Sequence, residues 1–114
     1  IGIFQRQKEM GLPMTVVGDG EQRRDFTYVG DIIRANMLAA ESENPDILGE
    51  IFNVGTNKNH SVLDVANIIG GETEFIPDRP GEARETLADL TKSRELLHYE
   101  PSVKLEDWIK SYEA

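Results

Sequence analysis

Residues 14–32 read Met-Thr-Val-Val-Gly-Asp-Gly-Glu-Gln-Arg-Arg-Asp-Phe-Thr-Tyr-Val-Gly-Asp-Ile, and this stretch decides the fold class. It opens with a β-branched run at 14–17, which favours a strand, and continues with a Gly-Asp-Gly turn in which glycine supplies positive φ. The alternating run 25–29 predicts a second strand or extended segment. Asp31 then stands where the N-cap of a helix over 32–43 is expected. Strands that alternate with helices indicate an α/β domain.

The sequence on either side continues this alternation. Apolar residues recur at helical spacing in several segments, and glycine or proline marks their ends. Ser61-x-x-Asp64 has the form of a capping box at the start of one of them. Short apolar runs predict further strands. The expected helices cover 1–10, 62–69, 91–98 and 104–113, and the expected further strands cover 50–54 and 73–76.

Length and composition limit the class of protein. A chain of 114 residues predicts a single domain that is large enough to bury one core. The formal net charge of -9 argues against a nucleic-acid partner, because binding along a phosphate backbone needs a basic surface. No run of apolar residues approaches the length of a membrane span, so we expect no membrane partner and a soluble, cytoplasmic protein. The first residue is isoleucine, which indicates either processing or a piece of a longer chain.

Most catalytic and metal-binding motifs are absent from the sequence. Because the chain has no cysteine, disulfides, cysteine-ligated zinc and thiol nucleophiles are excluded, and His60 and His98 lie too far apart to suggest a metal site. Gly18-x-Gly20 begins like a dinucleotide fingerprint, but Arg23 stands where the third glycine belongs. No tyrosine is followed by lysine four residues on. We therefore predict no catalytic residue, no metal and no cofactor contact within this chain.

Arginines in this acidic protein are the best candidates for ligand binding. Arg24 precedes the extended run, and Arg79 lies in a Pro/Gly loop that can hold a guanidinium fork ready for a phosphate. Glu82, three residues after Arg79, offers a carboxylate that could accept hydrogen bonds from a ribose diol. The alternative for each arginine is a salt bridge to one of the 21 acidic residues, and the spacing alone leaves both open.

Several segments, taken together and in order, resemble one family. They are 14–32, Ile51-Phe-Asn-Val-Gly-Thr56, Arg79-Pro-Gly-Glu82, Ala88-Asp-Leu-Thr-Lys-Ser-Arg94 and Leu97-His-Tyr-Glu-Pro101. This set is similar to the C-terminal half of the extended short-chain dehydrogenase/reductases that act on nucleotide sugars, nearest to the UDP-glucose 4-epimerases. One departure is Leu97-His98-Tyr99, which stands where the family usually has Leu-Gly-Trp.

The resemblance implies a fold and a set of contacts. It implies that residues 1–114 form the small mixed substrate-binding subdomain of a Rossmann-type enzyme. It also implies that Arg24 and Arg79 contact the diphosphate of a UDP- or dTDP-sugar and that Glu82 binds the ribose hydroxyls. Main-chain groups around Val16 and Val17 are expected to lie along the base.

The same resemblance implies what lies outside this chain. In the family, the glycine-rich NAD loop and the Tyr-x-x-x-Lys pair belong to the N-terminal half, so NAD is expected there and this chain alone is expected to be inactive. A full-length protein is expected to be a homodimer. Two other hypotheses remain open at this stage, a stand-alone nucleotide-sugar binding module without catalysis and a protein-interaction domain without a ligand.

Overall fold

Two parallel strands and three helices form one end of the molecule. The computed structural model describes residues 1–112. Strand β1 (Met14–Val17) pairs with β4 (Thr73–Ile76), with Met14 opposite Thr73 and Val17 opposite Ile76. Helices α1 (Gly2–Glu9), α3 (Val62–Ile69) and α5 (Leu105–Tyr112) contribute to the same core. This first cluster contains the buried residues Phe4, Met14, Val16, Val65, Ala66, Ile69, Leu105 and Ile109.

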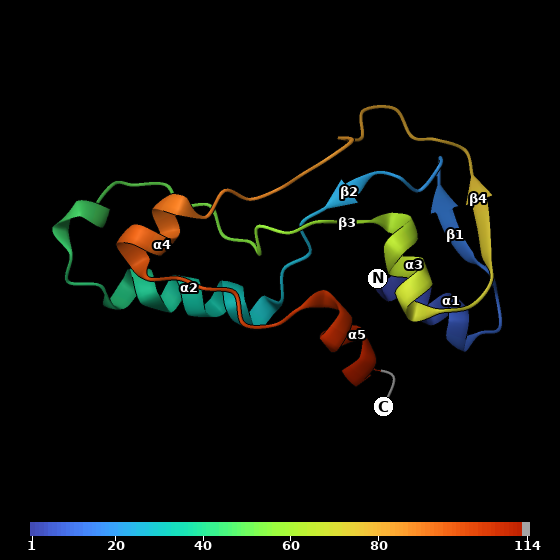
Figure 1. The fold of residues 1–114 in the computed structure, drawn as a ribbon, viewed down its shortest axis with the longest axis horizontal. Helices are drawn as coiled ribbons and strands as arrows, with labels where there is room; N and C mark the ends of the chain where they lie inside the picture. Colours follow the sequence, from blue (N-terminus) through green and yellow to red (C-terminus); the bar gives the residue numbers. More distant parts are fainter. Residues whose placement is uncertain (113–114) are drawn as a thin grey trace.

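The other end of the molecule is helical. Helix α2 (Val29–Glu41), the short 3-10 helix η1 (Pro45–Ile47) and helix α4 (Thr91–Leu97) lie together on the left of Figure 1. Buried residues of α2, of α4 and of the segments on either side of α4 form a second cluster of Ala35, Leu90, Leu97 and Tyr99. The Tyr99 hydroxyl is fully buried and donates to the Gly55 carbonyl at 2.8 Å, which ties the chain after α4 to the loop before β3.

A second pair of strands lies between the two ends. β2 (Arg23–Arg24) runs antiparallel to β3 (His60–Ser61), with Arg23 opposite Ser61 and Arg24 opposite His60. Both strands are two residues long, so the link between the two ends is narrow (Figure 1).

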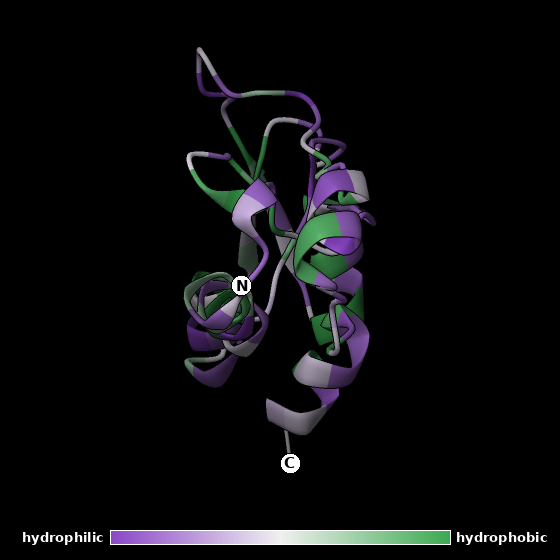
Figure 2. Ribbon diagram, turned by 90° about the vertical axis from the view of Figure 1, so that its left-hand side faces the viewer, coloured by the Kyte–Doolittle hydropathy of each residue, from purple (hydrophilic) through white to green (hydrophobic). Residues whose placement is uncertain are grey.

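The expectation of one core is wrong for the described residues, because the apolar side chains divide into two separate clusters. The molecule measures 52 × 35 × 16 Å and has a radius of gyration of 16.8 Å. A compact chain of this length has a radius of gyration of about 13 Å. Figure 2 shows the molecule along its longest axis, with hydrophobic and hydrophilic residues interspersed along the helices. Few residues can therefore be far from solvent.

Most of the predicted elements are confirmed. The structure contains α1, β1, α3, β4, α4 and α5 within two residues of their predicted limits, and the small mixed α/β class is correct. Residue 113, the last of the predicted C-terminal helix, lies outside the described residues. The capping box is also present, since the Asp64 N–H donates to Ser61 Oγ at 2.9 Å and the Ser61 N–H donates to Asp64 Oδ2 at 3.1 Å.

The strand predicted over 50–54 is wrong, and of the two alternatives for 25–29, a strand or an extended segment, the strand is wrong. After the Gly-Asp-Gly turn, the first strand pairing occurs at β2. Residues 25–28 form no strand. The N–H groups of the neighbouring loops donate to the Asp25 side chain instead of to a paired strand. Residues 50–54 are not a strand either. Phe52 and Val54 pack against the second cluster, and no strand among residues 1–112 lies alongside to accept their main-chain hydrogen bonds.

The predicted N-cap role of Asp31 is wrong as well. Helix α2 begins three residues earlier than predicted, at Val29, with Tyr28 as the N-cap residue. Asp31 lies in the first turn and is fully buried, and its carboxylate accepts hydrogen bonds from Ser102 and Val103. The acid that sequence analysis assigned to one helix end therefore joins α2 to a segment 71 residues later.

One side of α2 carries apolar side chains that face solvent. Val29, Ile33 and Met37 are 65%, 57% and 50% exposed, and their spacing of four residues places them in one stripe. We call these three residues the α2 stripe. Among residues 1–112, no helix is both long and apolar enough to cross a membrane.

Candidate functional site

The residues predicted to bind a ligand gather around one pocket, which we call the β1 pocket. It has a volume of about 230 Å³ and lies between α1, β1, β2 and the loop that follows β4. Arg24, Arg79, Glu82 and Val17 all line it, although they come from three separate segments of the chain. The complete lining is Ile1, Ile3, Phe4, Thr15, Val17, Gln22, Arg24, Val62, Ile76, Arg79 and Glu82.

Val16 is the predicted contact that the structure places elsewhere. Its side chain is fully buried in the first cluster. The Met14 N–H donates to the carbonyl of Glu72, just before β4, and the Gly18 N–H donates to Ile76, the last residue of β4, so the alternate residue Val16 presents its main chain to β4 as well. The main chains of Thr15 and Val17 face the other way, so these two residues form the strand edge beside the β1 pocket.

The four arginines near the pocket differ in what their side chains bind. Arg23 Nε donates to Asn59 Oδ1 at 2.8 Å, and its guanidinium lies 3.6 Å from Asp64. Arg84 forms a two-pronged ion pair with Asp19. By contrast, the Arg24 guanidinium donates only to the Arg23 carbonyl, at 2.7 Å, and Arg79 has no side-chain hydrogen bond or ion pair within residues 1–112.

The sequence left two roles open for each arginine, a ligand contact or a salt bridge, and the partners of the side chains bear on this choice. A salt bridge to a nearby acid accounts for Arg23 and Arg84, but not for Arg24 or Arg79 in the described part of the chain. The pocket therefore combines two guanidinium groups without acidic partners and one carboxylate, Glu82. Guanidinium forks suit phosphate oxygens, and a carboxylate suits hydroxyl donors.

Asp25, the residue after Arg24, binds two neighbouring loops. Its carboxylate accepts hydrogen bonds from the Thr56 N–H at 2.9 Å, the Thr56 hydroxyl at 2.6 Å, the Asn57 N–H at 3.1 Å and the Ala88 N–H at 3.2 Å. The Asp25 side chain thus joins the loops 55–57 and 86–88 to the end of β2. This role was not predicted, although the short, acceptor-rich Asp25 at the start of the run 25–29 was the available signal.

Gly55 makes this arrangement possible because it leaves no side chain in the way. A Cβ at position 55 would lie 2.6 Å from the Ala88 Cβ and 2.8 Å from Asp25 Oδ2, closer than such atoms can approach. The Gly-Thr pair at 55 and 56 is therefore a requirement of packing around Asp25.

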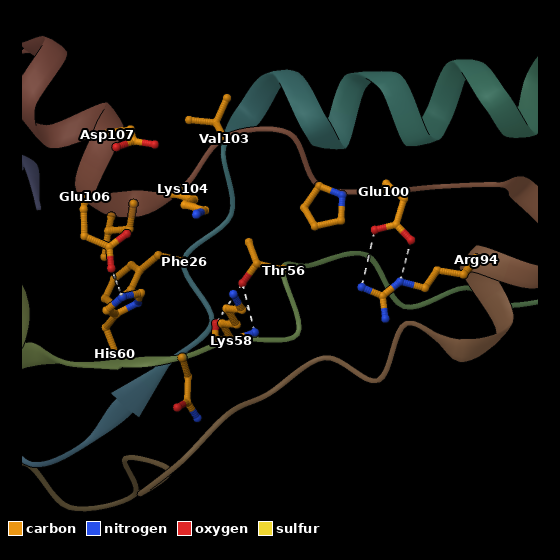
Figure 3. Close-up of a pocket in the computed structure, with 13 residues that line it drawn as sticks. Phe26, Thr56, Lys58, His60, Arg94, Glu100, Val103, Lys104, Glu106 and Asp107 are labelled. Atoms are coloured by element: carbon orange, nitrogen blue, oxygen red, sulfur yellow. Dashed lines mark hydrogen bonds and ion pairs between the residues drawn. The ribbon is translucent and has the colours of Figure 1, made fainter.

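A larger cavity of about 760 Å³ lies beside β3 and the start of α5 and contains none of the predicted contacts (Figure 3). At one side of it, His60 Nε2 lies 2.8 Å from Glu106 Oε1, and at the other side Arg94 Nε lies 2.8 Å from Glu100 Oε1. The Glu106 main-chain N–H and the His60 ring hold the pKa of Glu106 below its ordinary value. These pairs join α5 to β3 and α4 to the segment that follows it, so they serve the fold.

Comparisons with known proteins agree with the fold and the motif set. A family model described as GDP-mannose 4,6 dehydratase matches residues 3–112. An uncharacterised UDP-glucose epimerase of Bacillus subtilis is 37% identical over 103 residues, which are 85% of this chain and 32% of that protein. The UDP-glucose 4-epimerase of Mycolicibacterium smegmatis is 33% identical over 115 residues, covering 96% of this chain and 36% of the relative.

Solved structures that the chain resembles include nucleotide-sugar epimerases as well. The UDP-glucuronic acid 4-epimerase of Bacillus cereus, in complex with UDP-glucuronic acid and NAD, matches 95% of this chain with a TM-score of 0.86 and 37% identity, over 37% of its own chain. The UDP-glucose 4-epimerase of Thermotoga maritima, solved with UDP-glucose, matches 95% of this chain with a TM-score of 0.82 and 36% identity, over 36% of its own chain.

The chain belongs to the NAD-dependent nucleotide-sugar epimerase/dehydratase family of extended short-chain dehydrogenase/reductases. It spans about a third of the length of the curated relatives that it matches.

Proposed function

We propose that this chain holds the nucleotide diphosphate of a UDP-sugar for an NAD-dependent epimerase of the UDP-glucose 4-epimerase type. The observation that carries the proposal is the meeting of Arg24 and Arg79, both without acidic partners among residues 1–112, with Glu82 in the β1 pocket. The diphosphate lies between the two guanidinium groups, and the Glu82 carboxylate accepts hydrogen bonds from the ribose hydroxyls. The uracil lies along the edge of β1 at Thr15 and Val17.

The residues of this chain do not fit a dinucleotide site. The Gly18-Asp-Gly20 turn leads into β2 and not into a helix, so it lacks the helix N-terminus that binds a pyrophosphate. We therefore assign NAD, and with it the hydride transfer, to a part of the protein outside this chain. The residues described here bind and orient the substrate, while the catalytic groups come from elsewhere.

The α2 stripe supports this division. Three apolar side chains in line on a helix are costly to leave in water, and relatives about three times as long as this chain contain further protein to cover them. A stand-alone binding module and a ligand-free interaction domain remain the alternatives, and binding experiments separate them. The expected cytoplasmic location and homodimeric state stay predictions.

The double variant Arg24→Ala/Arg79→Ala tests the proposal. Each charge-assisted contact to a phosphate contributes about 1.5 to 3 kcal/mol, so we expect the variant to bind UDP-glucose at least a hundredfold more weakly in calorimetric titrations of the complete gene product. The pair Arg6→Ala/Arg94→Ala removes two charges outside the pocket and serves as the control. Equal affinity of the double variant and the wild type would refute the site. Binding without turnover would favour the stand-alone module, and no binding by wild type would favour the interaction domain.

A further inference from the structure

The loop 77–85, which carries Arg79 and Glu82, is attached at both ends to the turn between β1 and β2. At its first end, the Gly18 N–H donates to the carbonyl of Ile76 at 2.9 Å. Gly18 has a φ of +63°, and a Cβ there would lie 3.1 Å from Asp78 Oδ1. The beginning of the loop therefore passes directly over the glycine turn.

The second end of the loop is attached to β2 by its main chain. The Arg23 N–H donates to the Arg84 carbonyl at 2.9 Å, and the Thr86 N–H donates to the Arg23 carbonyl at 3.1 Å. These bonds place Arg84 beside the strand that carries Arg24. Among the described residues, those between Ile76 and Arg84 form no main-chain hydrogen bonds to the segment 18–23. They include Arg79 and Glu82, the two loop residues that line the β1 pocket.

The Arg84 side chain adds a second attachment at this end. Arg84 Nη1 donates to Asp19 Oδ1 at 2.9 Å, and Nη2 donates to Asp19 Oδ2 at 2.8 Å. Asp19 is itself fixed, because its Oδ1 also accepts the Glu21 N–H at 2.9 Å. The hydrogen bonds from Arg84 and from the Glu21 N–H lower the pKa of Asp19 to about 2, so the carboxylate is ionised at every pH at which the protein would be assayed.

We propose that Asp19 and Arg84 form a latch that positions the loop 77–85, so that Arg79 and Glu82 face Arg24 before the nucleotide diphosphate arrives. Both are positioning residues, since neither lines the β1 pocket. The proposal rests on the proposed function, because it assigns the latch to the same diphosphate site.

Solvent exposure of the Asp19–Arg84 ion pair limits its contribution to global stability. The side chains of Arg84 and Asp19 are 65% and 58% exposed, and ion pairs in this position add little to global stability. The effect on ligand affinity is larger, because a loop that is already held in its bound geometry loses less conformational entropy when the ligand binds. The effect of the latch should therefore appear in ligand affinity and hardly at all in the unfolding temperature.

A double-mutant cycle in the complete gene product tests the latch, with UDP as the probe. Asp19→Asn keeps the acceptor for the Glu21 N–H and removes the charge, while Arg84→Gln removes the fork. Each single variant should weaken UDP binding about three- to tenfold, and the double variant should bind no more weakly than the weaker single. Arg84→Lys should recover part of the loss. Asp46→Asn, an equivalent change on η1, should leave the affinity unchanged.

Amide hydrogen exchange without ligand separates failure of the latch from failure of the function. The Thr86 amide should exchange faster in both single variants and at the wild-type rate in Asp46→Asn, since loosening Arg84 frees the neighbouring hydrogen bond. If wild type binds no UDP, the proposed function fails and the exchange rates still decide whether the pair holds the loop. Unchanged affinity and unchanged exchange in both singles would overturn the proposal. Additive losses in the double variant would overturn it as well.

Discussion

His98 occupies a backbone conformation that is unfavourable for an L-amino acid. It ends α4 with φ 55° and ψ 33°, the left-handed region, and the following Tyr99 N–H donates to Ser93. Glycine is the usual residue at such a helix end, because any Cβ is strained there. The Leu-Gly-Trp pattern that the resemblance leads one to expect in place of Leu97-His98-Tyr99 would put glycine at this strained position.

Replacing His98 with glycine should therefore stabilise the protein. The expected increase in the free energy of unfolding is about 0.5 to 1 kcal/mol, which is the relief of strain reduced by the greater freedom of glycine in the unfolded chain. Urea denaturation measures it, and His98→Ala is the matched control, since it removes the imidazole but keeps the Cβ. The strain argument would be wrong if His98→Gly were no more stable than His98→Ala.

At the residue scale, the arginines that the sequence predicts as ligand contacts meet in one pocket, and their role as contacts stays a prediction. Arg24, Arg79 and Glu82 were predicted from motifs, and they line one pocket in the structure. Their pairing state could not be read from the sequence, because the partner that occupies Arg84 lies 65 residues away and the partner of Arg23 lies 36 residues away. Only the folded chain shows which guanidinium groups are left for a ligand.

Between elements, the carboxylate of Asp31 connects α2 to the segment before α5. The Ser102 hydroxyl donates to it at 2.6 Å, the Ser102 N–H at 3.0 Å and the Val103 N–H at 3.3 Å. Burial opposes the charge of Asp31, but these hydrogen bonds and the charge of Arg34 outweigh it, so the pKa lies below its ordinary value of 3.8. Folding therefore favours the ionised form of Asp31.

This connection predicts a specific response to acid. Because the pKa of Asp31 is lowered in the folded state, its contribution to stability is complete above pH 3.8 and is lost as the pH falls through the lower folded value. Asp31→Asn should lower the free energy of unfolding by about 1 to 3 kcal/mol at pH 7. The gap between the stabilities of wild type and variant should narrow as the pH falls below 3.8 in chemical denaturation. A gap that stayed constant over this range would contradict the assignment.

Elements with local signals were predictable, whereas elements that depend on distant partners were not. The capping box at Ser61 and the glycines after α3 fix that helix within a few residues of sequence. The runs 25–29 and 50–54 have the composition of strands, but a strand exists only where another strand pairs with it. In the described residues, that partner is absent for both runs, and Asp25 takes up the nearby amides instead.

At the scale of the whole molecule, the α2 stripe is an apolar surface that the structure leaves exposed to solvent. If further protein covers Val29, Ile33 and Met37, then Ile33→Glu should lower the unfolding temperature of the complete gene product by several degrees. In the isolated 114-residue chain, where Ile33 is 57% exposed, the same change should have little effect. Asn67→Glu on the exposed side of α3 is the control, and both can be followed by differential scanning fluorimetry. Equal effects in the two proteins would contradict the proposal.

The division of the apolar residues into two clusters could not be predicted from composition. The hydrophobic fraction and the length are those of an ordinary single-core domain, and the sequence does not state which helices meet. The separation follows from the two-residue length of β2 and β3, which is too short to bring α2 and α4 onto the sheet of β1 and β4.

The 16 Å thickness of the molecule also has a consequence for the lifetime of a bound ligand. The β1 pocket has its walls in α1, β1, β2 and the loop that follows β4, and Ile3, which lines it, is 70% exposed. A ligand beside so exposed a wall keeps a path back to solvent, and its residence time is set by the contacts that it must break. Nucleotide would therefore leave the isolated chain quickly, and a second wall supplied from outside would act as a barrier to escape.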